Sequence, residues 1–385
     1  MPLLPSCAIY SCMSAQNKTK ILILHDYFLY RGGGERLVIS LAKGLKADIA
    51  TAFIATNAFD PRTEGIRTIE LFKESRWSRL PGFRYLQVQL SFLFKTKFIR
   101  GYDVIIYSGD CLIALLRAKS KTNIAYMHTP PRHLYDCYHE RLNSYPLWKK
   151  VLFVPFAAFN RWRFETLSKK LDLIVTNSQN TRARIKKYLR LDSLVAYPPC
   201  TTLPFKNLGR GDYFFSWGRV HDVKRIPLIV EAFTRMPDKK LVVASGGPEL
   251  EKIKKIAAGY DNIKILGWIS DAQIIDYLGR CLATIYTPVR EDFGMTAVES
   301  MVAGKPVVGC AEGGLLEMIE DQINGLLLPA NPSAANLIAA VTALTPARAA
   351  AMESACYATA KKFTEEIFLE TMKKIISEVQ ARTNK

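Results

Sequence analysis

Two glutamates, Glu291 and Glu299, stand eight positions apart in the stretch R-E-D-F-G-M-T-A-V-E-S-M-V-A-G-K. A carboxylate can accept hydrogen bonds from two neighbouring hydroxyls, and free N–H groups at a helix N-terminus bind anions. A helix over A-V-E-S-M-V-A that stops at Gly304 would contain Glu299 and would place Glu291 and the amides of residues 292–294 at its start. The pair could therefore hold two parts of a hydroxyl-rich, anionic ligand. Alternatively, both are solvated glutamates near a helix end.

Two cations follow an expected strand in Y-F-F-S-W-G-R-V-H-D-V-K-R, where Arg219 comes directly after the strand and Lys224 five residues later. Arginine binds phosphate through a bidentate fork and lysine binds it as a point charge. Together they could neutralise a diphosphate and stabilise it as a leaving group without a metal. The alternative is a solvated basic turn.

A third candidate is the run of three glycines, Gly32–Gly34, between a strand and a helix expected to start near Glu35. Such a loop lets a ligand approach the backbone and the helix N-terminus. The pattern is not G-x-G-x-x-G, which disfavours a nicotinamide cofactor. A flexible turn is the alternative.

His128 ends the strand I-A-Y-M and precedes T-P-P-R-H-L-Y-D. Parallel α/β proteins bind ligands at the carboxyl ends of their strands, although a histidine there can also be a packed or capping residue. The five histidines of the chain show no metal-ligand spacing, so we expect neither a metal nor a cofactor.

These residues lie on a regular alternation of strand-like and helix-like segments. The expected strands fall into two series, the first at 20–25, 49–54, 104–107, 124–127 and 173–176, and the second at 213–217, 240–244, 263–267, 283–286, 306–309 and 325–328. This alternation is typical of parallel sheets covered by helices. The sequence predicts an α/β protein with two such sheets, and the family resemblance given below implies two Rossmann-like, doubly wound domains that face a cleft.

Proline and glycine residues mark the boundary between the two domains, in Y-P-P-C-T-T-L-P-F-K-N-L-G-R-G-D. The predicted organisation is a dispensable or mis-started extension at 1–12, a first domain at 13–199, a linker at 200–209, a second domain at 210–363 and, at 364–385, a helix that packs back on the first domain.

The composition points to an anionic partner and a reducing compartment. The formal net charge is +18 over 385 residues, which favours nucleic acid, a phosphorylated ligand or an anionic membrane as partner. The eight cysteines form no C-x-x-C pair, as expected for reduced cysteines in the cytosol. No run reaches the roughly 20 apolar residues of a membrane helix.

Residues 210–330 resemble the retaining glycosyltransferases of family 4, which have the glycosyltransferase-B fold. The resemblance rests on Arg219, Lys224, the E-D-F-G…E pair, A-G-K-P-V-V and G-G-x-x-E, which occur in this order. The first half resembles them through R-G-G-G-E and Y-M-H-T-P-P-R. The H-T-P-x-R wording is similar to mannosyltransferases of O-antigen or lipopolysaccharide synthesis that use GDP-mannose, with UDP-sugars as the next choice of donor.

The resemblance implies a role for each matching residue. It assigns the donor diphosphate to Arg219 and Lys224, the hydroxyls of the donor sugar to Glu291 with the backbone of Phe293, Gly294 and Met295, and the ribose to Glu299. It places His128 near the reacting carbon and the 6-position of the sugar, and the glycine loop, including Gly33 and Gly34, on the diphosphate or acceptor side. It also implies retention of configuration by a same-face displacement, in which the leaving diphosphate helps to deprotonate the acceptor.

Two basic, aromatic segments of the first domain, 76–100 and 141–164, carry eleven of the excess positive charges and no acid. That composition suits helices lying on an anionic membrane, and a core-packed helix with a solvated basic face is the alternative. We expect this side to receive a lipid-linked glycan or polysaccharide at the inner face of the cytoplasmic membrane. Its candidate residues are Arg76, Arg79, Arg132, Tyr135, Lys149 and Lys150.

Other classes of protein fit less well. Helix-turn-helix, zinc-finger and RNP patterns are absent, which disfavours a nucleic-acid-binding protein. A sugar-nucleotide epimerase shares the fold but has a different donor-side pattern, and a glycosidase needs two carboxylates that face each other across a sugar. The sequence therefore predicts a metal-independent hexosyltransferase that uses a nucleotide sugar.

Overall fold

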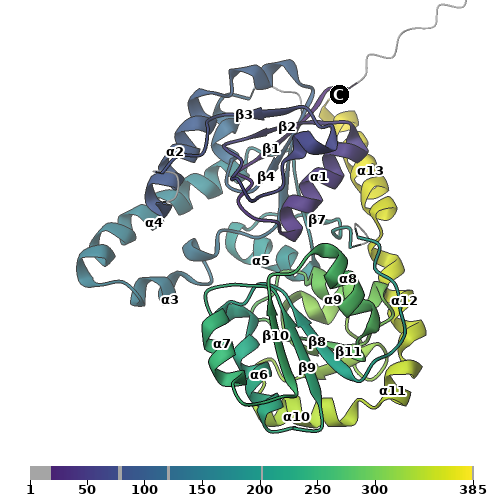
Figure 1. Cartoon of the computed structure of the whole chain (residues 1–385). Helices are drawn as coiled ribbons and strands as arrows, with labels where there is room; N and C mark the ends of the chain where they lie inside the picture. Colours follow the sequence, from purple (N-terminus) through teal and green to yellow (C-terminus); the bar gives the residue numbers. More distant parts are fainter. Residues whose placement is uncertain (1–18, 77–79, 119–121, 201–202, 384–385) are drawn as a thin grey trace, which may run out of the picture.

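The structure is a computed structural model that describes residues 19–76, 80–118, 122–200 and 203–383. The described residues form two parallel sheets, of seven and six strands, one in each half of the chain (Figure 1). The predicted fold class, two doubly wound α/β domains, is thereby confirmed. The predicted extension at 1–12 and the candidate residue Arg79 lie outside the described residues.

The strands are short, and those in the middle of each sheet are almost wholly buried, as expected for parallel sheets covered on both faces. The first sheet contains β1 (Ile21–His25), β2 (Asp48–Thr51), β3 (Thr68–Glu70), β4 (Val104–Ser108), β5 (Thr122–Met127), β6 (Leu173–Thr176) and β7 (Leu194–Val195). The second contains β8 (Tyr213–Trp217), β9 (Lys240–Ala244), β10 (Ile263–Gly267), β11 (Ala283–Tyr286), β12 (Val307–Cys310) and β13 (Gly325–Leu328).

The order of the strands places a switch point in each sheet. The orders are β3-β2-β1-β4-β5-β6-β7 and β10-β9-β8-β11-β12-β13. The chain therefore winds in opposite directions from β1 and β4, and again from β8 and β11. Ligands of open α/β sheets bind outside the carboxyl ends of the strands at such points.

Helices cover the sheets and join the two halves. They are α1 (Gly33–Leu45), α2 (Pro81–Phe94), α3 (Tyr138–Asn143), α4 (Leu147–Ser168), α5 (Gln179–Leu189), α6 (Ile226–Thr234), α7 (Leu250–Ala257), α8 (Asp271–Arg280), α9 (Met295–Val302), α10 (Ala334–Ala343), α11 (Pro346–Ala351), α12 (Glu353–Ala360) and α13 (Glu365–Thr383). Figure 1 shows α2, α3 and α4 on one side of the first half and α13 on the other.

The last helix packs on the first sheet although it follows the second domain in sequence. Its apolar residues Phe368, Met372 and Ile376 belong to the same buried cluster as β1, β4 and β5. Ser40 of α1 donates a hydrogen bond to Glu365 at 2.5 Å. The C-terminal segment is therefore part of the core of the first half.

All eleven predicted strands are present, with bounds that differ by up to three residues at an end. Two strands, β3 and β7, were not predicted. The first helix, predicted to start near Glu35, begins two residues earlier at Gly33, so Gly33 and Gly34 form its first turn. Gly32 takes the N-cap position instead.

Among the helices of the described residues, no single one has both the length and the apolar composition needed to cross a membrane. The segments Ala334–Ala343 and Pro346–Thr383 meet that criterion only as a pair, bent by 78°.

Candidate active site between the two sheets

Glu291 lies in the loop that joins β11 to α9, and it contacts two side chains. Its Oε2 atom is 2.7 Å from Nζ of Lys224 and accepts a hydrogen bond of 2.9 Å from the hydroxyl of Tyr286. Nζ of Lys224 also donates to the Tyr286 hydroxyl at 2.6 Å. The structure thus brings the predicted Lys224 and Glu291 together, and adds Tyr286, which sequence reasoning missed.

The three groups stabilise one another's charge states. Burial alone would lower the pKa of Lys224, but Tyr286 and Glu291 outweigh it and raise that pKa. Burial, together with the charge of Glu291, raises the pKa of the Tyr286 hydroxyl. Lys224 is therefore an ammonium and Tyr286 a neutral phenol at neutral pH. Within the described residues only Oε2 of Glu291 is engaged, so Oε1 remains able to accept a hydrogen bond.

The loop after Glu291 holds the start of α9 in a conformation that requires glycine. Gly294 is the N-cap residue with φ of 105°, and a Cβ atom built there would lie 2.7 Å from Leu315. The Phe293 side chain is buried against Tyr197 and Phe363. Phe293 can therefore offer a ligand its backbone but not its ring.

Glu299 lies inside α9 and is 7% exposed. Burial raises the pKa of its carboxyl to about 7, the negative charge of Asp271 acts in the same direction, and Arg36 opposes both. Arg36 belongs to α1 of the first half and forms an ion pair of 3.3 Å with Asp271 of α8. Burial therefore destabilises the ionised form of Glu299, which lies beside a contact between the two domains.

Arg219, after β8, is exposed, and its guanidinium lies over the ring of Tyr30 at 4.5 Å from the centroid. Tyr30 belongs to the loop between β1 and α1. In the described chain Arg219 has no carboxylate partner, so its five N–H donors face no competing acid.

The glycine loop lies between His128 and the start of α9. A Cβ atom on Gly33 would come within 2.5 Å of the sulfur of Met295, and one on Gly34 would lie 3.8 Å from Cε1 of His128. A side chain at Gly33 would therefore press on the second domain. The structure thus brings Gly33, Gly34, His128 and Met295 together.

His128 follows β5 and is half-buried, and its Nε2 lies 3.0 Å from the hydroxyl of Ser108. Burial and the neighbouring His25 lower its pKa to about 4. Its imidazole is therefore neutral at pH 7, so it can form hydrogen bonds but carries no charge.

Two carboxylates at the carboxyl ends of β1 and β4 were missed by sequence reasoning. Asp26 follows β1 and Asp110 follows β4, and burial raises the pKa of each to about 6. Asp26 accepts a hydrogen bond of 3.2 Å from the backbone of Asp110. Their positions directly after two neighbouring strands are the signal that could have identified them.

Arg132 lies in an ion network between the two domains. Its guanidinium is 2.7 Å from Asp292 and 3.2 Å from Asp136, and it donates to the carbonyl of Arg290. Arg184 of α5 pairs with the same two aspartates. Arg132 therefore joins the two domains in addition to any contact with a ligand.

The other candidates for the acceptor side are spread over the first domain. Tyr135 stacks on Tyr188 at 5.0 Å and donates to Glu165 at 3.3 Å. Arg76 and Lys149 are exposed and Lys150 is half-buried. The structure therefore does not gather these residues at one point.

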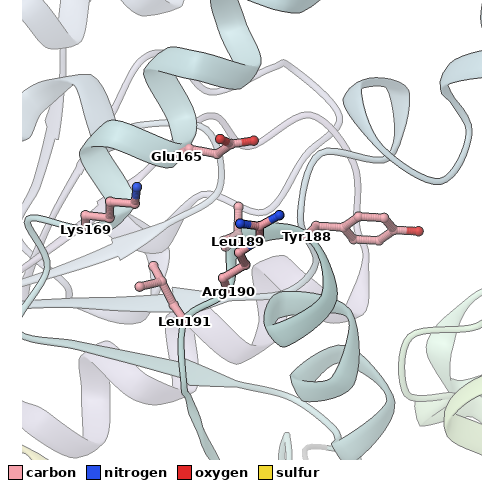
Figure 2. Close-up of a pocket in the computed structure, with 6 residues that line it drawn as sticks. All are labelled: Glu165, Lys169, Tyr188, Leu189, Arg190 and Leu191. Atoms are coloured by element: carbon pink, nitrogen blue, oxygen red, sulfur yellow. The ribbon is translucent and has the colours of Figure 1, made fainter.

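Figure 2 shows a cavity between α4 and α5, lined by Glu165, Lys169, Tyr188, Leu189, Arg190 and Leu191. None of the predicted donor-binding residues lines it. This cavity is therefore separate from the junction between the sheets, where Arg219, Lys224 and the start of α9 lie. Among the described residues, no three His, Cys, Asp or Glu side chains gather as a metal site.

Comparison with known proteins identifies the family of the chain. The family model of glycosyl transferases group 1 matches residues 205–362, and that of Glycosyltransferase Family 4 matches residues 31–199. The chain belongs to the family 4 glycosyltransferases. The predicted family and the predicted class of enzyme, a hexosyltransferase, are confirmed.

Relatives of this glycosyltransferase extend over nearly its whole length. It is 26% identical to the human alpha-1,3/1,6-mannosyltransferase ALG2 over 94% of this chain and 96% of that protein. The mouse ALG2 is 27% identical over 84% and 87%, respectively.

Solved structures share the fold of this glycosyltransferase. HepE from Anabaena in complex with UDP and glucose superimposes with a TM-score of 0.69 at 20% identity, over 93% of this chain and 99% of that one. Sucrose-phosphate synthase from Thermosynechococcus elongatus has a TM-score of 0.75 at 17% identity, over 94% and 100%.

Proposed function

We propose that this glycosyltransferase moves mannose from GDP-mannose to a lipid-linked glycan or polysaccharide, with retention of configuration, at the inner face of the cytoplasmic membrane. The observation that carries the donor half is the cluster of Lys224, Tyr286 and Glu291 beside the start of α9. Mannose is favoured by the ALG2 relatives, whose name states mannosyl transfer. A UDP-sugar is the second candidate, supported by the complexes of HepE with UDP and glucose.

In the proposed complex the diphosphate lies between Arg219 and Lys224, the donor sugar faces Oε1 of Glu291, and the ribose reaches Glu299. The bond from the anomeric carbon to the diphosphate breaks, the acceptor oxygen bonds to the same face of that carbon, and the acceptor proton passes to the leaving diphosphate. The two cations stabilise the charge that develops on the leaving group, so the proposal requires no metal. Positioning of both substrates contributes the rest of the rate enhancement.

A panel of radiolabelled sugar nucleotides tests the donor. With membrane extract as the source of acceptor, GDP-mannose is expected to label a product at least tenfold faster than GDP-fucose, UDP-glucose or UDP-galactose. The control is the Lys224→Met variant, which lacks the cation that we assign to the diphosphate. Transfer from a UDP-sugar alone would replace the proposed donor, and neither transfer nor hydrolysis of any of them would contradict the function.

The helices α2 and α4 support a membrane-bound acceptor. Large apolar side chains project from both into solvent, among them Leu147 (81% exposed), Val151 (71%) and Trp148 (64%) on α4. On α2, Phe83, Leu86, Leu90 and Phe94 line a hollow that Lys95 borders. The two helices are joined where Arg163 of α4 donates to the hydroxyl of Tyr85 at 2.7 Å. Exposed apolar patches with basic neighbours are typical of membrane-contact surfaces.

Vesicle sedimentation tests this surface. We expect the protein to bind vesicles that contain anionic lipid and to bind neutral ones far less, because a basic residue near such a surface contributes about 1 kcal/mol. Lys149→Gln with Lys150→Gln should weaken binding up to about thirtyfold, since two such contributions add up to about 2 kcal/mol, and Trp148→Ser should weaken it as well. Matched controls are Lys254→Gln with Lys255→Gln on α7, and Trp268→Ser, since Trp268 is 76% exposed in the second domain. Equal binding to both kinds of vesicle, or none to either, would refute the membrane surface.

A further inference from the structure

Three polar side chains form a row of hydrogen-bonded groups across neighbouring strands of the first sheet. His25 ends β1, Ser108 ends β4 and His128 directly follows β5, and β4 lies between β1 and β5. The Ser108 hydroxyl lies 3.2 Å from Nδ1 of His25 and 3.0 Å from Nε2 of His128. Ser108 is 1% exposed and His25 is 6% exposed. One buried hydroxyl therefore connects the two imidazoles.

Only a few protons are available to the three hydrogen-bonded side chains of His25, Ser108 and His128. Burial lowers the pKa of both imidazoles to about 4, so at pH 7 each ring carries one N–H. A hydroxyl has one proton to donate. Two arrangements satisfy all three groups: Ser108 donates to His25 and accepts from His128, or it donates to His128 and accepts from His25. A buried donor left without an acceptor is costly, which disfavours the remaining arrangements.

The neighbouring carboxylate distinguishes these two arrangements. Oδ1 of Asp26 is 3.7 Å from Nε2 of His25. This distance is too long for a hydrogen bond, but the negative charge on that side favours a proton on Nε2 by electrostatic attraction. Nδ1 of His25 is then bare and accepts from Ser108. The Ser108 oxygen in turn accepts the N–H of His128.

We propose that Asp26, His25 and Ser108 are positioning residues that hold His128 with its proton on Nε2, so that its Nδ1 accepts a hydrogen bond from a hydroxyl of the transferred sugar. In the described residues Nδ1 of His128 has no other partner, and the ring lies against Gly34. Gly33, next to it, contacts Met295 at the start of α9. The free nitrogen is therefore at the domain junction where the donor is assigned. The identity of its hydroxyl partner rests on the proposed function, whereas the proton arrangement does not.

Nitrogen NMR of the histidine rings tests the arrangement in the protein without substrate. The chain has only five histidines, and His25→Gln and His128→Gln variants assign their signals. At pH 7 both rings are expected to show a protonated Nε2 and a bare Nδ1. In Ser108→Ala the signals of His128 should move toward a mixture of the two neutral forms, and in Asp26→Asn those of His25 should do the same. A proton on Nδ1 of His128 in the natural protein, or unchanged signals in both variants, would overturn the proposal.

The rate of sugar transfer gives a second readout. Ser108→Ala should lower kcat/KM for the donor about tenfold, the usual effect of one misdirected hydrogen bond. Ser300→Ala is the matched control, because Ser300 is equally buried and its hydroxyl bonds Thr284 at 2.9 Å and the carbonyl of Thr296 at 2.8 Å in the second domain. The Ser300→Ala variant should retain the kcat/KM of the natural protein. A natural rate in Ser108→Ala would contradict the role in positioning. Absence of transfer by the natural protein would contradict the proposed function and leave the NMR result standing.

Discussion

Replacement of Glu291 by alanine is expected to lower kcat/KM for sugar transfer about a hundredfold or more, and to lower Tm because Lys224 loses its carboxylate partner, while the protein still folds. The carboxylate fixes Lys224 at 2.7 Å and Tyr286 at 2.9 Å through Oε2 and leaves Oε1 for the donor sugar. A hydrogen bond to a charged group contributes roughly 1.5–3 kcal/mol, and the loss of the anchor for Lys224 adds to this effect. Steady-state rates at low and saturating donor concentrations measure the change.

Two further variants control for the loss of a charge and of an ion pair. Glu231→Ala removes a glutamate of α6 that pairs with Arg235 at 2.6 Å, far from the donor residues in sequence, and should leave the rate unchanged. Glu291→Gln keeps an acceptor oxygen without the charge and should have an intermediate rate. A natural rate in Glu291→Ala would remove Glu291 from the active site.

The sequence was sufficient for the central strands because their burial is visible in their composition. Runs such as V-I-I-Y and Y-F-F-S-W are apolar at nearly every position, as strands covered on both faces must be. The two missed strands have no such runs. β3 has only three residues, all half-buried, and β7 has two, one of them exposed. Both lie at the edges of the first sheet, where a strand is buried less and leaves little trace in the sequence.

The candidate site was predictable where one segment contains both the ligand-binding groups and the turn that presents them, as between Glu291 and Glu299. Contacts between the domains were not predictable, because they depend on how the two sheets are oriented. Arg36 and Asp271 are 235 positions apart, and Arg219 contacts Tyr30 of the other domain. The placement of Arg132 against Asp292 has the same origin. Whether these residues bind ligand stays a prediction.

Replacement of Glu299 by glutamine is expected to stabilise the protein at pH 8 by up to about 3 kcal/mol. Burial raises the pKa of Glu299 from 4.5 to about 7. Between these values the folded chain holds a proton that the unfolded chain has released, so the contribution of this group to stability falls as the pH rises from 4.5 to 7 and is constant above that. Glutamine is neutral throughout. The two proteins should therefore have similar free energies of unfolding near pH 5 and differ at pH 8 in chemical denaturation.

A second glutamate with a shift of opposite sign provides the control. Hydrogen bonds from Asn207 and Tyr357 and the charge of Arg210 overcome burial and lower the pKa of Glu353. Its contribution to stability is present above the unfolded pKa and is lost as the pH falls. Glu353→Gln should therefore destabilise the protein at pH 8, where Glu299→Gln stabilises it. The comparison of each variant with the natural protein cancels the effects of other buried acids such as Asp26 and Asp110.

The same Glu299→Gln variant should lose about tenfold or more in kcat/KM for the nucleotide sugar. An ionised carboxylate can accept hydrogen bonds from both ribose hydroxyls, whereas an amide offers one acceptor and two donors. Hydrogen bonds to the charged form favour ionisation, so a bound ribose would offset the cost of the buried charge. The kcat/KM of the natural protein should accordingly rise as the pH increases through about 7, whereas that of the variant should not. If the variant is stabilised but keeps the kcat/KM and the pH profile of the natural protein, Glu299 has no role in binding. If the variant loses both the kcat/KM and its dependence on pH, the unfavourable buried charge of Glu299 serves to bind the donor.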